Sequence, residues 1–383
     1  MTIPLLNPFR FGDLALNETF TDRESELAQL TADIRNGQNV VIFAPRRYGK
    51  SSLIWRAAQQ LVKEGSVLIA QVDLMKAPTK ERLAEKLATA IYEEIASPMF
   101  KLREQAIAVF RGLRILPAMT VGLDGSMSFS FAAGQASSDI NATLEHLLEL
   151  PARLAAERGR RVALVLDEFQ EITRIDPGLL PLMRAIFQEQ PEVAHVYLGS
   201  RRHMIEQVFN DQNEPFWRSA RQLELGPIPA QPFTAYINAA FERSGRQIDA
   251  ETVAQLLSIT HCHPYGTQEL SYATWEATPA SACASTAELS AALDQVLRSE
   301  NAHFSRIWER ASRAQRLMLE AVARAPGRPA LGAAYRRDHG LPGPSTAQKA
   351  LTALTEDELV MPAQTGYRIA EPFLAEWILK RGM

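Results

Sequence analysis

The chain has 383 residues, a formal net charge of -3 and a hydrophobic fraction of 46%, which are ordinary values for a globular protein of two or three domains. Two cysteines, no evident signal peptide and no apolar run of membrane-spanning length argue against a disulfide-rich secreted protein and against a membrane protein. We therefore expect a cytoplasmic protein without a membrane partner, and the weak negative charge does not favour a chain coated in nucleic acid.

The first predicted element is a helix that ends near Arg35, before the turn pair Asn36-Gly37. Asp22 is the expected N-cap, and Glu24 lies in the first turn, where negative charge is favourable. Phe20 and Arg23, at the start of this segment, are candidates for contact with a nucleotide base. The alternative is an ordinary amphipathic helix that packs on a sheet.

A phosphate-binding loop is predicted next. Residues 40–43 form an apolar run typical of a doubly buried strand, and Gly49-Lys50-Ser51 then opens a helical segment. In the pattern G-x-x-x-x-G-K-[ST], Lys50 would contact the β- and γ-phosphates and Ser51 would bind Mg²⁺. Ala44 replaces the first glycine, which requires a negative φ there. The alternative is a chance match in a basic loop. The predicted loop residues are Pro45, Arg46, Arg47, Tyr48, Gly49, Lys50, Ser51 and Ser52.

Alternating strands and helices follow, which is the order of an α/β fold. A second buried strand ends at Asp73, and a helix covers 79–95. A β-hairpin insertion is predicted at 116–133, around Asp124-Gly125. The next predicted helix, 139–158, contains Pro151, which is expected to kink or split it.

A third buried strand ends in the acidic pair Asp167-Glu168. Ligands of open α/β sheets bind at the carboxyl ends of the strands, so Asp167 would bind Mg²⁺ directly or through water. Glu168 would orient or deprotonate an attacking water. The alternative is a solvated strand end, which the pairing with Lys50-Ser51 upstream disfavours.

A fourth strand, 194–198, precedes Ser200, which would sense the γ-phosphate or position water. Arg201 is the catalytic candidate among several arginines that would stabilise developing charge. The others are Arg202, Arg218 and Arg221. A fifth strand is predicted at 221–225, and Gly226 to Pro229 reads as a domain boundary.

Helices dominate the remainder and predict a lid, at 231–243, 249–260, 267–278, 285–301 and 304–324. The triplet His261-Cys262-His263 lacks further metal ligands and favours a structural turn. The last eighty residues predict three helices and a terminal β element, as in a winged helix. Arg336, Arg337 and Lys349 are its candidate DNA contacts, and a packing or oligomerisation role is the alternative.

These motifs together resemble the archaeal-type, AAA+-related ATPases of the STAND group. The resemblance implies a P-loop NTPase fold of α/β class, with a parallel five-stranded sheet, an all-α lid and a C-terminal winged helix. It implies ATP and Mg²⁺ as ligands, Lys50 and Ser51 as Walker A residues, Asp167 and Glu168 as the Walker B pair, and Ser200 as sensor 1. Pro227, Pro264 and Tyr265 resemble residues near the adenine. The segments that carry the resemblance are Asn7 to Phe9, Phe20 to Leu27, Pro45 to Leu53, Leu166 to Gln170, Gly199-Ser200 and Gly366 to Phe373.

We therefore predict an ATPase core at 1–226, a lid at 227–302 and a winged helix at 303–383. The expected function is a nucleotide-dependent switch that hydrolyses ATP slowly and moves the lid and winged helix, with a protein partner or a second copy of the chain as its target. The alternatives are a DNA-binding regulator with ATP as a structural ligand, and a scaffold with a degenerate ATP site.

Overall fold

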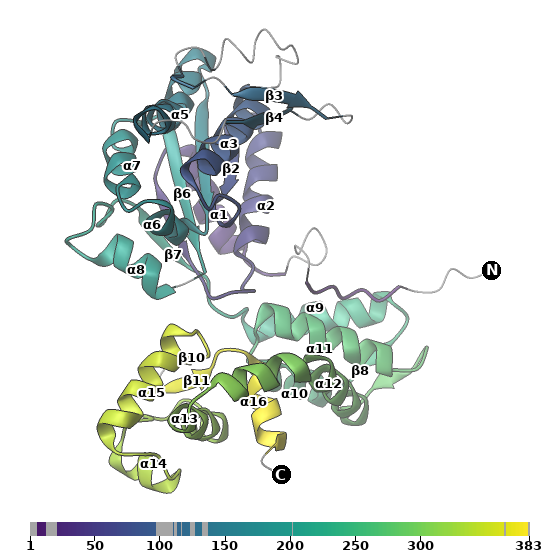
Figure 1. Ribbon diagram of the computed structural model, residues 1–383. Helices are drawn as coiled ribbons and strands as arrows, with labels where there is room; N and C mark the ends of the chain where they lie inside the picture. The colour runs from purple at the N-terminus through teal and green to yellow at the C-terminus, as the bar shows by residue number, and fades with distance from the viewer. Residues whose placement is uncertain are drawn as a thin grey trace. The chain divides into compact units, whose positions relative to one another are not determined.

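The structure is a computed structural model, and it describes residues 6–12, 21–96, 110, 113–115, 117–122, 127–131, 137–200, 202–363 and 365–381. The chain divides into two compact units. We call them the core unit, Arg23–Arg46 with Lys50–Leu225, and the helical unit, Met1–Asp22 with Arg47–Gly49 and Gly226–Met383. Figure 1 shows the elements of each unit.

The core unit is built on a five-stranded parallel sheet, which confirms the predicted fold class. The strand order is β2-β5-β6-β1-β7. All residues of β1 and β6 are buried, as expected for strands covered on both faces. The strands are β1 (Val40–Phe43), β2 (Val67–Asp73), β5 (Arg161–Asp167), β6 (Val193–Gly199) and β7 (Arg221–Glu224).

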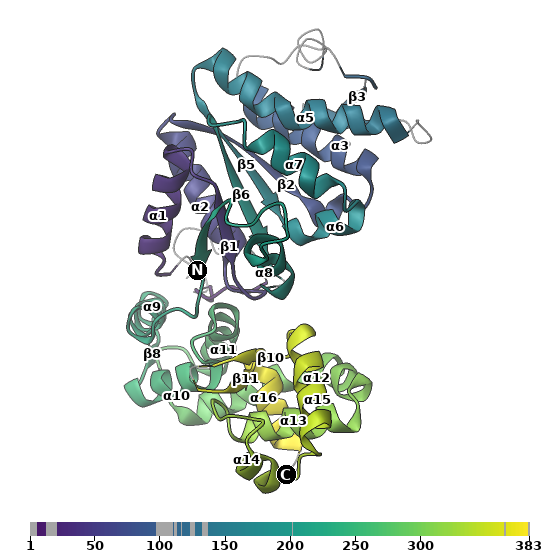
Figure 2. The ribbon, with the colours of Figure 1, turned by 90° about the vertical axis from the view of Figure 1, so that its left-hand side faces the viewer.

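Helices cover both faces of this sheet. Helices α1 and α2 pack together on one face, and α3, α5 and α7 pack on the other (Figure 2). Each buries apolar side chains, which is the stable layer arrangement for a parallel sheet. The α-helices of this unit are α1 (Glu24–Arg35), α2 (Lys50–Lys63), α3 (Lys80–Ala90), α5 (Ser137–Arg158), α6 (Ile172–Ile175), α7 (Leu179–Phe187) and α8 (Arg202–Asn210). Shorter elements are η2 (Leu74–Lys76), η3 (Ile91–Ala96), η5 (Phe169–Glu171) and the antiparallel pair β3 (Ala118–Val121) and β4 (Met127–Ser130).

The structure differs from two local expectations for the core unit. Helix α1 has Arg23, not Asp22, as its N-cap, and the Glu24 carboxylate accepts the Arg23 backbone N–H at 3.1 Å. Helix α5 continues from Ser137 to Arg158, so Pro151 does not split it, and the alternative expectation of a kink stays a prediction. The turn at Asp124-Gly125 lies outside the described residues.

The helical unit begins with four helices and a short parallel strand pair. Phe9 is buried among these helices, with ring centroids 6.0 Å from Tyr236 and 5.4 Å from Phe241. Asn7 donates to the Tyr272 carbonyl at 3.1 Å. The elements are α9 (Ala230–Arg243), β8 (Gln247–Ile248), α10 (Ala250–Thr260), α11 (Pro264–Ala277), β9 (Cys283–Ala284) and α12 (Thr286–Arg310).

The winged helix completes this unit. Strands β10 and β11 pair antiparallel, and α16, which was not predicted, buries Phe373, Leu374 and Trp377. The boundary expected at 302–303 lies inside α12, so the three-domain division remains a prediction. In the part of the chain that the structure describes, no helix is long and apolar enough to cross a membrane. The elements are α13 (Arg313–Arg324), α14 (Ala333–Asp338), α15 (Pro344–Glu356), β10 (Val360–Pro362), β11 (Tyr367–Ile369) and α16 (Pro372–Arg381).

Candidate functional site

The predicted phosphate loop connects β1 to α2, and Lys50 is the first residue of that helix. Its buried ammonium group donates to the carbonyl oxygens of Ala44 at 2.7 Å and Pro45 at 3.1 Å. Ala44 lies outside the left-handed region, so alanine is tolerated there. Gly49 has φ +87°, where a side chain would be strained. The loop therefore has a backbone that these residues can adopt.

The acidic pair lies at the carboxyl end of β5. Asp167 is in register with Asp73 of β2, and its Oδ1 accepts the Glu168 backbone N–H at 2.9 Å. The pKa of Asp167 is raised to about 6, first by burial and then by the charges of Glu168 and Asp73. Lys50 lowers the pKa of Asp167 and that of Glu168, so its charge reaches both carboxylates. The structure thus brings the predicted lysine and acidic pair together.

Glu168 is held by residues of the neighbouring strand end. Ser200, which follows β6, donates to Glu168 Oε2 through its hydroxyl at 2.8 Å and its backbone N–H at 3.3 Å. Gln170 Nε2 donates to the same oxygen at 2.5 Å. Burial raises the pKa of Glu168, but the hydrogen bonds from Gln170 and Ser200, with the charge of Lys50, together lower it by more than burial raises it. The pKa of Glu168 therefore lies below its ordinary value. Glu168 is therefore oriented as a carboxylate beside Asp167.

The other loop residues divide between the two units. Arg46 is exposed, Ser51 is half-buried and Ser52 is buried in the core unit. Arg23 is buried and pairs with Glu26 at 2.8 Å, which holds its guanidinium within α1. Phe20 and Arg201 lie outside the described residues.

Arg47 and Tyr48 contact other residues of the helical unit. The Arg47 guanidinium lies 4.1 Å from the centroid of the Tyr265 ring and 3.9 Å from the Glu371 carboxylate. The Tyr48 hydroxyl accepts from Arg368 at 3.0 Å. These contacts join the loop tip to α11, to β11 and to the residue Glu371 that follows it.

The His261-Cys262-His263 triplet forms a structural turn. Its first two residues have positive φ, and the His263 side chain caps α11 by accepting the Gly266 N–H at 3.1 Å. Pro264 is the first residue of α11. Pro227 precedes Ile228, whose backbone N–H donates to the Cys262 carbonyl of this turn at 3.2 Å.

The candidate DNA contacts lie on two helices of the winged helix. Arg336 on α14 is half-buried and donates to the Leu331 carbonyl at 3.2 Å. Arg337 on α14 and Lys349 on α15 are exposed. Only the latter two therefore present an exposed charge.

A family model described as an ATPase domain predominantly from Archaea matches residues 20–214, more than half of the chain. The chain belongs to this ATPase family. A second family model, for a winged helix domain, matches residues 302–380. A search of curated proteins found no match.

Solved structures share the fold of this archaeal-type ATPase. A Walker-type ATPase of Pyrococcus abyssi is 16% identical, with a TM-score of 0.66 over 97% of this chain and 99% of that one. The ORC2 protein of Aeropyrum pernix in its ADP form is 15% identical, with a TM-score of 0.52 over 97% and 99%. The ORC1 protein of Aeropyrum pernix, solved in complex with DNA, is 14% identical, with a TM-score of 0.50 over 95% and 94%. At these identities the likeness shows the fold alone.

The donor set of the ATPase site fits a magnesium ion held jointly with a nucleotide. Among the described residues, no group of three or more His, Cys, Asp or Glu side chains could hold a metal. Mg²⁺ ordinarily takes one or two protein ligands and fills its shell with water and phosphate oxygens. The charges of Glu168 and Asp73 add to the burial that raises the pKa of Asp167, and a bound cation would offset the repulsion among these carboxylates.

Sequence reasoning missed two residues of this edge. Asp73 was recognised only as a strand end, although acids at the ends of parallel strands share one edge of a sheet. Gln170 was noted only as part of the Leu166 to Gln170 segment. Its spacing from Glu168 gives no signal for the hydrogen bond, because the intervening backbone enters the left-handed region at Glu168.

Proposed function

We propose that this chain is an ATP-hydrolysing molecular switch of the STAND type. The observation that carries the proposal is the arrangement at the carboxyl edge of the sheet, where Ser200 holds Glu168 beside Asp167. Lys50 is close enough to lower the pKa of both acids. Such an edge is where open α/β sheets bind ligands.

The phosphate loop would bind the triphosphate. Lys50, which donates to two loop carbonyls, would turn to the β- and γ-phosphates, and the amides at the start of α2 would face the anion. Ser51 and Asp167 would hold Mg²⁺, which would neutralise phosphate charge and orient the γ-phosphate when bound. Phe20, Arg23, Pro227, Pro264 and Tyr265 are the candidates for contact with the base.

Hydrolysis would depend on Glu168 as the residue that orients or deprotonates water. Its carboxylate is ionised and fixed, which suits an acceptor of the water proton. Ser200 would hold this carboxylate and respond to the γ-phosphate, with Arg201 as the candidate for stabilising the transferred group.

The switch would act through the loop tip. Arg47–Gly49 belong to the helical unit, whereas Arg46 and Lys50 on either side belong to the core unit. ATP and ADP would stabilise different conformations of this shared loop and so favour different states of the lid and winged helix. A partner protein or a second copy of the chain would read the difference.

Turnover of purified protein tests the proposal. Glu168→Gln should lower kcat for ATP by about 100-fold or more, because general-base catalysis contributes at that scale. ATP binding should remain, measured by titration calorimetry. If wild type and variant turn over equally little while both bind ATP, the chain is a scaffold with a non-hydrolytic site.

DNA binding is the second candidate function, favoured by exposed Arg337 and Lys349 on the winged helix. The fold is shared with an ORC1 protein solved in complex with DNA. Loss of both charges should weaken binding to duplex DNA and reduce its salt dependence by roughly one to two released counterions. Fluorescence anisotropy across a salt series measures this for Arg337→Ala/Lys349→Ala. Unchanged or salt-independent binding would contradict DNA contact by these residues.

A further inference from the structure

Gln170 contacts the carboxylate that the proposed hydrolysis depends on. It lies in η5, two residues after Glu168, and its side chain is 1% exposed. Its Nε2 donates to Glu168 Oε2, which also accepts the hydroxyl and the N–H of Ser200. All three donors act on one oxygen. Within the described residues, no hydrogen bond to Glu168 Oε1 is seen, so that oxygen remains able to accept a proton from water.

The backbone at Glu168 makes this contact possible. Glu168 has φ 53° and ψ 47°, a left-handed conformation that is uncommon for a residue with a side chain. It turns the chain directly after β5, so that Gln170 reaches back to the carboxylate. Strained conformations of this kind persist where surrounding contacts determine them, and they occur preferentially at functional sites.

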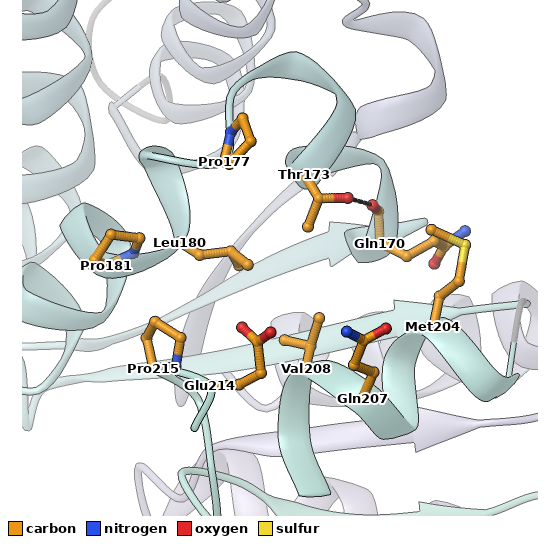
Figure 3. A pocket seen from close by; sticks show the side chains of 10 residues that line it. All are labelled: Gln170, Thr173, Pro177, Leu180, Pro181, Met204, Gln207, Val208, Glu214 and Pro215. Atoms are coloured by element: carbon orange, nitrogen blue, oxygen red, sulfur yellow. Dashed lines mark hydrogen bonds between the residues drawn. The ribbon is translucent and has the colours of Figure 1, made fainter. Parts of the chain in front are cut away.

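Gln170 also lines a cavity of about 260 Å³ in the core unit. Figure 3 shows its side chain there, with the Thr173 hydroxyl donating to the Gln170 carbonyl oxygen. Gln207 lines the same cavity from α8. The Gln170 Oε1 atom has no hydrogen-bond partner among the described residues. Among the described residues, the side-chain hydrogen bond of the Gln170 amide is therefore the one to Glu168, and the rest of the side chain borders the cavity.

We propose that Gln170 is a positioning residue for Glu168. By fixing Oε2 together with Ser200, it keeps Oε1 directed to the attacking water. The inference rests on the proposed function, since it assigns Gln170 to the same hydrolytic step. Without the amide, Glu168 would sample orientations in which Oε1 does not meet the water, and turnover would fall while ATP binding would not change.

A double-mutant cycle on turnover tests this role. Gln170→Met removes the donor and keeps a similar volume, and it should lower kcat about tenfold with KM within about twofold. In the Glu168→Gln background the same change should cause no further loss. Gln207→Met is the matched control, because it makes the same substitution in the same cavity, and it should leave kcat unchanged. An equal loss in both backgrounds, a change in KM alone, or an equal effect of Gln207→Met would overturn the inference.

A second cycle separates this inference from the proposed function. If wild type binds ATP without turnover, the proposed function fails, and the contact is tested by urea unfolding of wild type, Gln170→Met, Glu168→Ala and the double variant. Non-additive changes in the urea midpoint show that the two side chains act together, and additive changes overturn the inference. Gln170→Leu replaces Gln170→Met should the latter not fold.

Discussion

At the level of single residues, the structure places carboxylates close to one another in both units. Asp167 was predicted as a ligand from its place at the end of a buried strand, and the register then adds Asp73 beside it. The pattern of apolar residues identifies a strand but not which residue of a neighbour lies opposite. The contact of Gln170 with Glu168 could not be predicted either, because it depends on the direction of two side chains in the irregular turn that follows β5.

A second buried acid, Glu269 on α11, gives a prediction about pH. The pKa of Glu269 is raised from 4.5 to about 7, first by burial and then by the charges of Glu300 and Glu371, against the opposing effect of Arg47. The folded chain therefore binds this proton more strongly than the unfolded chain. The stability from protonated Glu269 is full below pH 4.5 and is lost as the pH rises through 7.

Glu269→Gln should remove that loss. Its free energy of unfolding should exceed that of wild type by an amount that grows from pH 5 to pH 8, reaching about 1–3 kcal/mol. Urea unfolding at a series of pH values measures the difference. Glu242→Gln on α9 is the control, because that side chain is exposed and its replacement should change little at any pH. A constant difference across the series would contradict the assignment.

Most strands and helices were predictable from periodicity because each must bury one face or both. The run that forms β1 is apolar throughout, and those of β5 and β6 are apolar apart from Arg161, Asp167 and His195, which identifies strands inside a parallel sheet. The final helix α16 was missed, although it buries Phe373 and Trp377. The start of α1 was also placed wrongly, since Arg23 and not Asp22 is its N-cap.

The end of β6 provides a prediction about packing. A Cβ added to Gly199 would lie 2.2 Å from Ile205 Cγ1 and 2.7 Å from Gln170 Oε1. Gly199→Ala should therefore destabilise the core unit by about 1–3 kcal/mol and lower ATP turnover by displacing Gln170. Thermal unfolding and turnover of one preparation measure both effects.

The matched control is Gly226→Ala, where an added Cβ meets nothing within 4 Å. It should unfold at the wild-type temperature. If Gly199→Ala also unfolds at the wild-type temperature, that result contradicts close packing of β6 against α8 and η5.

At the scale of the whole molecule, the sequence predicted the family and the fold, and the nucleotide chemistry follows as a proposal. The contacts of the loop tip, Arg47–Gly49, were not predictable from the sequence. The contacts of Arg47 with Tyr265 and Glu371 join segments that are far apart in the chain. The proposed switch would use these contacts, since a change in loop conformation would alter them. The proposed switch requires nucleotide binding.

Titration calorimetry of Mg-ATP into the purified chain tests that claim most directly. The account predicts saturable heat with one site per chain, and at least about tenfold weaker binding for Lys50→Met, which corresponds to about 1.4 kcal/mol of lost interaction. Equal affinity of wild type and Lys50→Met, or no heat from either, would contradict it.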